Sequence, residues 1–250
     1  MRRLEGRVAI VTGGGHGIGK FYARRLAEEG AKVVIAEIDG PAAELVAGEI
    51  GGAMALRTDV SDQTSVDAMA AKTIERFGRI DVLVNNAAIF ATVPMSRSPF
   101  DQIDPAEWDR MMAVNLRGTW LACRAVIPQM RKQGYGKIIN ISSGTALKGS
   151  ASRIHYVTSK AGILGFTKTL AMEVGKDNIC VNCIAPGSTL SEENADEALV
   201  KYRQAAASTR ALQRLQTPED LVGAVAFFAS PDSDFITGQT LVVDGGAHMH

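Results

Sequence analysis

Short apolar runs alternate with longer amphipathic stretches from one end of the chain to the other. The apolar runs are RVAIVTG, AKVVIAEID, AMALRTDV, RIDVLVNNAA, GKIINISS, NICVNCIAPG and GQTLVVDGG. Continuous Val, Ile and Leu are typical of strands that are covered on both faces. Strands that alternate with helices form βαβ units with right-handed crossovers. The pattern therefore predicts an α/β domain built on a parallel sheet.

The amphipathic stretches predict helices over about 18–29, through the forties, up to about 77, and over about 105–132 and 154–175. A further helix should begin after Thr217 as N-cap, with Pro218 at its first position and acids in its first turn. The region from about Ser188 to Gln216 is polar, rich in Ala and poorly periodic. Ligands of open α/β sheets bind beyond the carboxyl ends of the strands, so this region is a candidate substrate lid.

The chain has 250 residues, with 27 basic and 27 acidic side chains and a formal net charge of zero. This length suits one α/β domain, and the lack of a basic excess argues against a nucleic-acid partner. Near-neutral charge suits a soluble enzyme with a small substrate. The first apolar run is too short for a signal peptide, and no run approaches a membrane span. A cytoplasmic location with no membrane partner is therefore expected.

The three cysteines do not form a disulfide framework. Cys180 and Cys183 form C-x-x-C, but their spacing on a predicted strand puts the side chains on opposite faces. Two buried thiols are expected there, because a redox or metal pair would need a turn. No metal-ligand set is visible. His248 and His250 lie on a short tail that is expected to be exposed or interfacial.

A glycine-rich loop, TGGGHGIG from Thr12 to Gly19, follows the first predicted strand and opens the first helix. The free N–H groups and positive dipole end of a helix bind pyrophosphate, and glycines let the backbone come close. This placement predicts a dinucleotide site, with an ordinary glycine turn as the alternative.

Glu37 ends the second predicted strand, about twenty residues beyond the loop. An acid there accepts the ribose hydroxyls of the adenosine and repels a 2′-phosphate, which favours NAD over NADP. His16 points the other way as a cation that could meet a phosphate, but histidine is mostly neutral at pH 7. Asp59 and Val60 end the third strand, where they would hold the adenine; a turn or capping role for Asp59 fits equally well.

Tyr156 and Lys160 lie one helical turn apart on one face. Ser143 ends the preceding strand, at the edge where parallel strands present chemistry. A phenol with a pKa near 10 is a poor base at pH 7. A neighbouring ammonium and a positive nicotinamide both favour the phenolate, so Tyr156 is expected to act as an acid/base with a lowered pKa.

In this order along the chain, the motifs resemble those of the short-chain dehydrogenase/reductase family, and the resemblance covers essentially the whole sequence. TGGGHGIG resembles the family's cofactor loop, and Asp59-Val60 resembles its adenine contact. NNAA from Asn85 to Ala88 resembles its NNAG, with Ala88 in place of Gly. APG at Pro186 and Gly187 resembles the segment that touches the nicotinamide, and Ser191 stands where Thr is more usual.

The resemblance implies one Rossmann-type domain over 1–250, with a seven-stranded parallel sheet in the order 3-2-1-4-5-6-7 and helices on both faces. It also implies the cofactor contacts, which are Gly13, Gly15, His16, Gly17, Ile18, Gly19, Glu37, Ile38, Asp59, Val60, Asn86, Ala87, Tyr156, Lys160, Pro186, Gly187, Thr189 and Ser191.

Four residues match the family's catalytic positions: Asn115 in VNLRG, Ser143 in ISS, and Tyr156 and Lys160 in YVTSK. The resemblance implies that Tyr156 exchanges a proton with the substrate oxygen and that Ser143 stabilises the charge on that oxygen. Lys160 would hold the nicotinamide ribose, and Asn115 would bind a water that links Lys160 to solvent.

The expected substrate wall comprises Thr145, Leu147, Arg153, His155, the loop after Ala88 and the candidate lid. Lys148 and Arg153 could pair with a carboxylate, although surface charge is the simpler interpretation. In the family, the long helices before GKIINISS and after Arg153 pack across subunits, which implies a homotetramer.

The sequence is thus interpreted as an NAD(H)-dependent oxidoreductase that interconverts a secondary alcohol and a ketone, with a small-molecule alcohol or ketone as its only substrate partner. One alternative is an NADPH-dependent 3-oxoacyl carrier-protein reductase, against which Glu37 and the absence of Arg in the glycine loop argue. A second is a non-enzymatic dinucleotide sensor on the same fold, against which the four retained catalytic positions argue.

Overall fold

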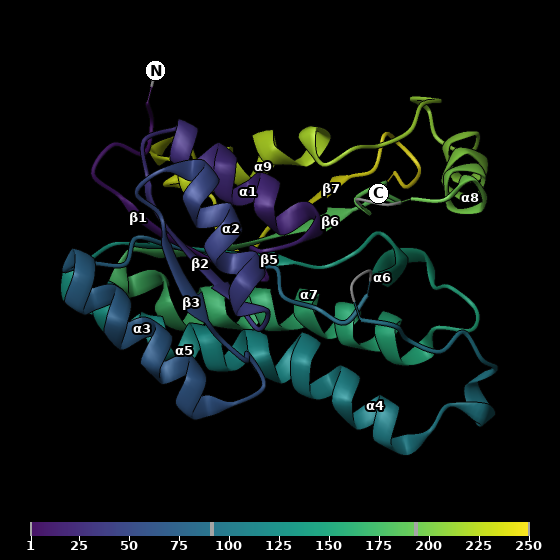
Figure 1. Ribbon diagram of the computed structural model, residues 1–250, viewed down its shortest axis with the longest axis horizontal. Helices are drawn as coiled ribbons and strands as arrows, with labels where there is room; N and C mark the ends of the chain where they lie inside the picture. The colour runs from purple at the N-terminus through teal and green to yellow at the C-terminus, as the bar shows by residue number, and fades with distance from the viewer. Residues whose placement is uncertain (1, 91–92, 193–194, 250) are drawn as a thin grey trace.

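A parallel sheet forms the centre of the molecule in the computed structural model, which describes residues 2–90, 93–192 and 195–249. The sheet has seven strands in the order β3-β2-β1-β4-β5-β6-β7, and all neighbouring strands are parallel. This confirms the predicted fold and strand order (Figure 1). The strands are β1 (Val8–Thr12), β2 (Lys32–Glu37), β3 (Met54–Arg57), β4 (Val82–Asn85), β5 (Gly136–Ile141), β6 (Ile179–Pro186) and β7 (Thr240–Val243).

Helices cover both faces of the sheet. One face is packed by α1 (Gly17–Glu28), α2 (Gly40–Ile50) and α9 (Glu219–Ala229), and the other by α3 (Gln63–Phe77), α5 (Gly118–Gln133) and α7 (Ile154–Val174). Helix α4 (Pro105–Met112) continues into α5 through a π-helical segment (Ala113–Arg117). Shorter helices are α6 (Thr145–Lys148), α8 (Glu197–Ala207) and the 3₁₀ segments Phe100–Gln102, Gly175–Asp177 and Pro231–Ser233.

The strand residues divide into two apolar cores, one on each face. In β1, Ala9 and Val11 join the core beneath α1 and α9, whereas Ile10 joins the core beneath α3 and α5. Alternate residues of a strand point to opposite faces, so a strand covered on both sides is apolar at most positions. Each fully buried Val, Ile or Leu side chain contributes on the order of 1.5–3 kcal/mol. This explains why the strands were readable as continuous apolar runs.

The strand order reverses between β1 and β4, and their carboxyl ends diverge at that point. Thr12 joins the two ends: its hydroxyl donates to the Val84 carbonyl at 3.2 Å and accepts from the N–H groups of Asn86 and Ala87. The Asn86 side-chain amide donates in turn to the carbonyls of Thr12 and Gly13, at 3.1 and 2.9 Å. Such a switch point is where open α/β sheets bind ligands.

Two local predictions about the C-terminal third need correction. Helix α9 begins at Glu219 with Pro218 as its N-cap, one residue later than expected, and the Thr217 N–H donates to the Asp220 carboxylate at 3.0 Å. The region 188–216 is not irregular throughout, because it contains α8, which Asp196 caps through the Leu199 N–H. Only Arg203 and Ala207 are buried in α8, so no apolar period marks this helix in the sequence.

The C-x-x-C pair lies on β6 as predicted. Cys180 and Cys183 are buried free thiols that face opposite sides of the strand, so the expectation of two core thiols is confirmed. No helix in the three described ranges is long and apolar enough to cross a membrane.

Candidate active site

A cleft of about 450 Å³ opens along the carboxyl ends of the strands. It brings together residues that follow β1, β2, β3, β4, β5 and β6, together with one face of the start of α7. All but three of the predicted site residues line it, and these three are Gly15, Gly19 and Asn115. The two glycines belong to the loop itself, and Asn115 is buried behind the cleft wall.

The glycine loop fits a phosphate group for two reasons. A side chain at Gly15 or Gly19 would clash with neighbouring atoms, and no side chain caps the first N–H groups of α1. A Cβ on Gly19 would fall 2.0 Å from the Gly13 carbonyl oxygen, and one on Gly15 would fall 2.8 Å from Cγ of Glu37. Helix α1 has no side-chain cap and no acid in its first turn. The N–H groups at a helix start need partners, and an anion in the cleft would supply them.

Glu37 is fixed at the end of β2 beside the loop. Its carboxylate accepts from the N–H of Gly15 at 3.2 Å and of Ile38 at 2.8 Å, and the residue is buried. His16 does not stand as a free cation, because its Nε2 pairs with Asp39 at 3.0 Å. The hydrogen bond from His16, with one from the Ala42 N–H, holds the pKa of Asp39 below its usual value. Asp59 lines the cleft and also has a turn role, accepting from the N–H and hydroxyl of Ser61.

Tyr156, Ser143 and Lys160 meet at the other end of the cleft. Tyr156 is buried and stacks on Phe90, with ring centroids 5.0 Å apart. Lys160 Nζ donates to the Ile141 carbonyl at 2.9 Å and lies 6.0 Å from the centre of the Tyr156 ring. Burial lowers the pKa of Lys160 to about 8.

The expected lowering of the Tyr156 pKa is not found. Burial raises the pKa of the phenol, and this outweighs a hydrogen bond with Ser143 and the positive charges of Arg153 and Arg203, which act in the opposite direction. Desolvation disfavours the charged form of any buried group, and the sequence prediction, which weighed a neighbouring ammonium and a positive nicotinamide, did not include this effect. The phenol is therefore set up as a proton donor, in the form needed to protonate a carbonyl oxygen.

Asn115 lies in the π-helical segment and links the loop after β4 to α7. Its side-chain oxygen accepts from the Ile89 N–H at 2.8 Å, and its amide donates to Ser159 Oγ at 3.2 Å. Short π-helical segments are frequent at functional sites. The observed contacts position Ile89 and Ser159 around the catalytic groups.

Comparisons with known proteins agree with this arrangement. A family model described as enoyl-(acyl carrier protein) reductase matches residues 13–248. The chain is 38% identical to a subunit of (2S)-[(R)-hydroxy(phenyl)methyl]succinyl-CoA dehydrogenase from Thauera aromatica, over 98% of each chain. It is 40% identical to galactitol 2-dehydrogenase from Agrobacterium fabrum, over 99% of each chain.

A solved structure is equally similar. The 3-ketoacyl-(acyl-carrier-protein) reductase from Brucella melitensis, complexed with NADH, superposes with a TM-score of 0.90 at 36% identity, covering 98% of this chain and 100% of that one. The chain belongs to the short-chain dehydrogenase/reductase family. It is thus an oxidoreductase. Because its relatives are named for different substrates, family membership does not determine which substrate this chain binds.

In this family member, the segment after β6 is closely packed. A Cβ on Gly187 would fall 2.6 Å from Oε1 of Gln216 and 2.7 Å from Cβ of Asp244. Gln216 also bridges to Thr189, whose hydroxyl donates to the Gly187 carbonyl at 3.2 Å. Sequence reasoning missed Gln216 and Asp244, although the position of Asp244 directly after the last strand could have signalled it.

The tail after β7 is not an exposed end at His248. This histidine lines the cleft, and its Nδ1 pairs with the buried Asp244 carboxylate at 2.5 Å; its expected place at an interface stays a prediction. His250 lies outside the described residues. Among the residues that the structure describes, no group of three or more His, Cys, Asp or Glu could hold a metal ion.

The predicted substrate wall is partly correct. Thr145 and Arg153 line the cleft, as does the loop after Ala88 through Ile89, Phe90 and Val93; positions 91 and 92 are outside the described residues. Leu147 is exposed, and His155 is buried against Glu107 at 3.1 Å, so neither faces the cleft. Tyr202 and Arg203 on α8 were missed as individual residues.

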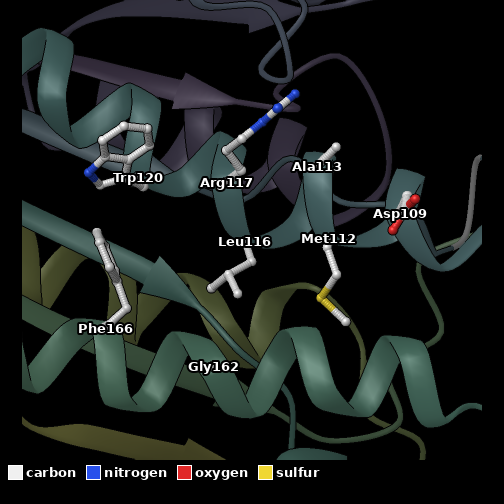
Figure 2. Close-up of a pocket in the computed structure, with 8 residues that line it drawn as sticks. All are labelled: Asp109, Met112, Ala113, Leu116, Arg117, Trp120, Gly162 and Phe166. Carbon is white, nitrogen blue, oxygen red and sulfur yellow. The ribbon is translucent and has the colours of Figure 1, made fainter.

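A second hollow, of about 670 Å³, lies between the α4–α5 helix pair and α7 and shares no residue with the cleft (Figure 2). Figure 2 shows Met112 and Leu116 above Gly162 of α7, with Trp120 and Phe166 facing one another at one end. The hollow is mostly apolar and carries none of the catalytic groups. It is therefore distinct from the cleft, although Ala113 and Leu116 in its wall flank Val114 and Asn115.

Gly15→Ala should lower the affinity for NADH by about tenfold or more. The new Cβ would meet Glu37 and Ala42 at 2.8 and 3.1 Å, and overpacking by one methyl costs about 1–3 kcal/mol. Fluorescence titration of NADH measures this. The matched control is Gly48→Ala on α2, where a Cβ meets nothing within 4 Å; it should bind NADH like the parent. Equal affinity in both variants would contradict the fit of the loop.

Proposed function

We propose that this chain is an NAD(H)-dependent oxidoreductase that interconverts a secondary alcohol and a ketone, with Tyr156 as general acid/base. One observation carries the proposal. The buried phenol of Tyr156 shares one cleft with Ser143, Lys160, an uncapped helix start and the carboxylate of Glu37. A dinucleotide along this cleft would bring its reactive ring to the phenol.

Each catalytic side chain has a distinct task in the proposed reaction. In reduction, the Tyr156 hydroxyl donates its proton to the carbonyl oxygen as that oxygen becomes an alcohol; in oxidation, the phenolate takes the proton back. The Ser143 hydroxyl donates a hydrogen bond to the same oxygen and stabilises its developing charge. The bound dinucleotide supplies or accepts the hydride, and the protein orients and polarises.

Lys160 and Asn115 serve the proton and the cofactor in this proposal. The buried Lys160 amine, with its lowered pKa, would hold the nicotinamide ribose hydroxyls, and its positive charge together with that of the bound ring would bring the Tyr156 pKa down. Asn115, next to Ser159 on the inner face of α7, would bind the water that connects Lys160 to solvent.

NAD rather than NADP is the proposed cofactor. Three backbone donors, the N–H groups of Gly15, Ile38 and Asp39, hold the Glu37 carboxylate at the place where an adenosine ribose would end. There it would accept both ribose hydroxyls and repel a 2′-phosphate. The pairing of His16 with Asp39 supports the same choice, since a histidine already bonded to a carboxylate does not serve as a partner for a 2′-phosphate. A preference for NADPH would instead favour the alternative, a 3-oxoacyl carrier-protein reductase.

The region 188–216 is proposed as the substrate lid. Helix α8 supports this, because it turns Tyr202, Arg203 and Ala206 toward the cleft. We also propose that the protein acts in the cytoplasm on a small alcohol or ketone, without a nucleic-acid or membrane partner.

A homotetramer is proposed for the assembly. The second hollow supports it, because α5 and α7 leave Trp120 half-exposed beside Phe166, and Met112 and Leu116 line the same apolar surface. Light scattering at micromolar concentration should give four times the chain mass of 26.6 kDa. The mass of a single chain would refute the proposal.

Tyr156→Phe should lower kcat by about 10²–10⁴-fold, the usual contribution of a general acid/base, with NADH affinity retained. The test is turnover of a panel of secondary alcohols with NAD, followed by absorbance of the reduced cofactor. Tyr135→Phe removes a phenol outside the cleft and serves as the control. Unchanged turnover in Tyr156→Phe would contradict the mechanism, and a panel with no activity in the parent would favour the dinucleotide sensor.

NADH should be preferred to NADPH by at least about tenfold in kcat/KM, and Glu37→Ala should reduce this preference, because it removes the repulsion of a 2′-phosphate. Initial rates with both cofactors and one ketone measure it. Glu28→Ala, at the exposed end of α1, should keep the parent ratio. A strong NADPH preference in the parent would overturn the cofactor assignment.

A further inference from the structure

Two arginines flank the catalytic phenol. The positive charges of Arg153 and Arg203 both act on Tyr156, where they oppose the effect of burial on its pKa. The guanidinium carbon of Arg203 lies 5.9 Å from the centre of the Phe90 ring, which itself stacks on Tyr156. Both arginines line the cleft. A substrate whose reacting carbon meets Tyr156 therefore comes close to two guanidinium groups.

Arg203 is buried with part of its hydrogen-bonding capacity unused. Only 6% of the residue is exposed. Nη1 donates to Ser188 Oγ at 3.0 Å and Nη2 to the Glu192 carboxylate, whereas the buried Nε has no partner among residues 2–90, 93–192 and 195–249. A buried donor without an acceptor is costly, so a native structure that keeps one calls for an explanation. An acceptor brought by the substrate would supply it.

Arg153 is held in place without a counter-charge. Ser150 Oγ accepts from its Nε at 3.2 Å and its Nη2 at 2.5 Å. No Asp or Glu in the described ranges forms an ion pair with it. Arg153 is also the N-cap of α7, a 21-residue helix with no acid in its first turn. A cation at the positive end of a helix dipole is unfavourable, and the start of α7 has no acidic residue to offset it.

The backbone before Arg153 is strained. Ser152 has a φ of +62°, in the left-handed region that side chains other than Gly, Asn and Asp rarely adopt. Residues kept in such conformations cost of the order of 1–3 kcal/mol and cluster at ligand sites. The turn at Ser152 leads directly into Arg153 and then, three residues on, into Tyr156.

We infer that the substrate carries a carboxylate near its reacting carbon, and that Arg153 and Arg203 bind it. The substrate class is thus a hydroxy acid and its oxo acid, and the inference rests on the oxidoreductase function proposed above. Guanidinium groups match a planar carboxylate in a bidentate way. A phosphate is the other common partner of arginine, but a carrier thioester bears its phosphates at the far end of a long pantetheine arm, away from the phenol.

Matched pairs of substrates test this. The parent enzyme is assayed with NAD and with 2-, 3- and 4-hydroxy acids of four or five carbons, each beside its methyl ester. At least one acid should exceed its ester by about 100-fold or more in kcat/KM, the size expected for a buried charge pair. Arg153→Gln should lower the acid-to-ester ratio of kcat/KM to near one, whatever its effect on the absolute turnover of either substrate, and Arg153→Lys should restore part of that ratio.

A charge-matched control and a binding readout complete the design. Lys168→Gln removes one positive charge from the same helix at an exposed site outside the cleft and should keep the parent's acid-to-ester ratio. Calorimetric titration of the enzyme–NADH complex with butyrate and with butyramide measures recognition without turnover. Butyrate should bind the parent and bind Arg153→Gln at least about tenfold more weakly, and butyramide should not discriminate between them.

The outcomes separate the two proposals. Esters and acids turned over equally, with butyrate no tighter than butyramide, would overturn the carboxylate inference and leave the oxidoreductase function standing. No turnover of any alcohol, with butyrate still bound through Arg153, would overturn the proposed function and support the anion site. Preference for a coenzyme A thioester over all free acids would also overturn the inference, because it would assign the charges to phosphate.

Discussion

The hydrogen-bonded junction of Thr12 and Asn86 fixes the glycine loop and the start of α1 above the carboxyl ends of the strands. It holds the ends of β1 and β4 at a set separation and anchors the glycine loop through the Gly13 carbonyl. Gly19 then packs directly over that carbonyl, so α1 starts where its free N–H groups face the cleft. Because Gly13 and Asn86 also line the cleft, its floor is made of the same atoms that join the two halves of the sheet.

The fold was predictable from sequence because both faces of the sheet are buried. Most strand positions are then apolar, and the strands stand out as runs even without periodicity. Helix α8 was not predictable in the same way, since Arg203 is one of only two residues that it buries. Ala207, the other, gives too short an apolar stripe to mark a helix. A helix that covers a cleft rather than a core leaves little trace in the hydrophobic pattern.

The catalytic positions could be found because their spacing is local, but their electrostatics could not. Tyr156 and Lys160 follow from one turn of helix. Two features depend on tertiary structure. One is the burial of the Tyr156 phenol, and the other is the approach of Arg203 from α8, far along the chain. His248 shows the same limit, since its pairing with Asp244 converts a tail histidine into part of the cleft wall. Sequence motifs predicted the proposed reacting groups, whereas the groups that set charge and shape around them came from elsewhere in the chain.

Family membership does not determine the substrate, because the two ends of the cleft are built from different parts of the fold. The cofactor end of the cleft is built from backbone and strand ends, which the fold itself supplies. The substrate end is built from side chains on α8, on the turn before α7 and on the tail, which can change without disturbing the sheet. Relatives named for a succinyl-CoA derivative, a sugar alcohol and a carrier-bound ketone can therefore share one scaffold.

The π-helical segment at Asn115 borders both hollows of the molecule. Val114 lines the cleft, while Ala113 and Leu116 line the groove between the helices, and Asn115 between them is bonded to Ser159 beside the catalytic groups. A change on the groove side is thus one peptide unit from the chemistry. If the proposed homotetramer uses this surface, a variant that separates subunits through Ala113 or Leu116 would also act on the backbone that holds Asn115. Lost activity in such a variant would therefore not measure what a neighbouring subunit contributes to catalysis.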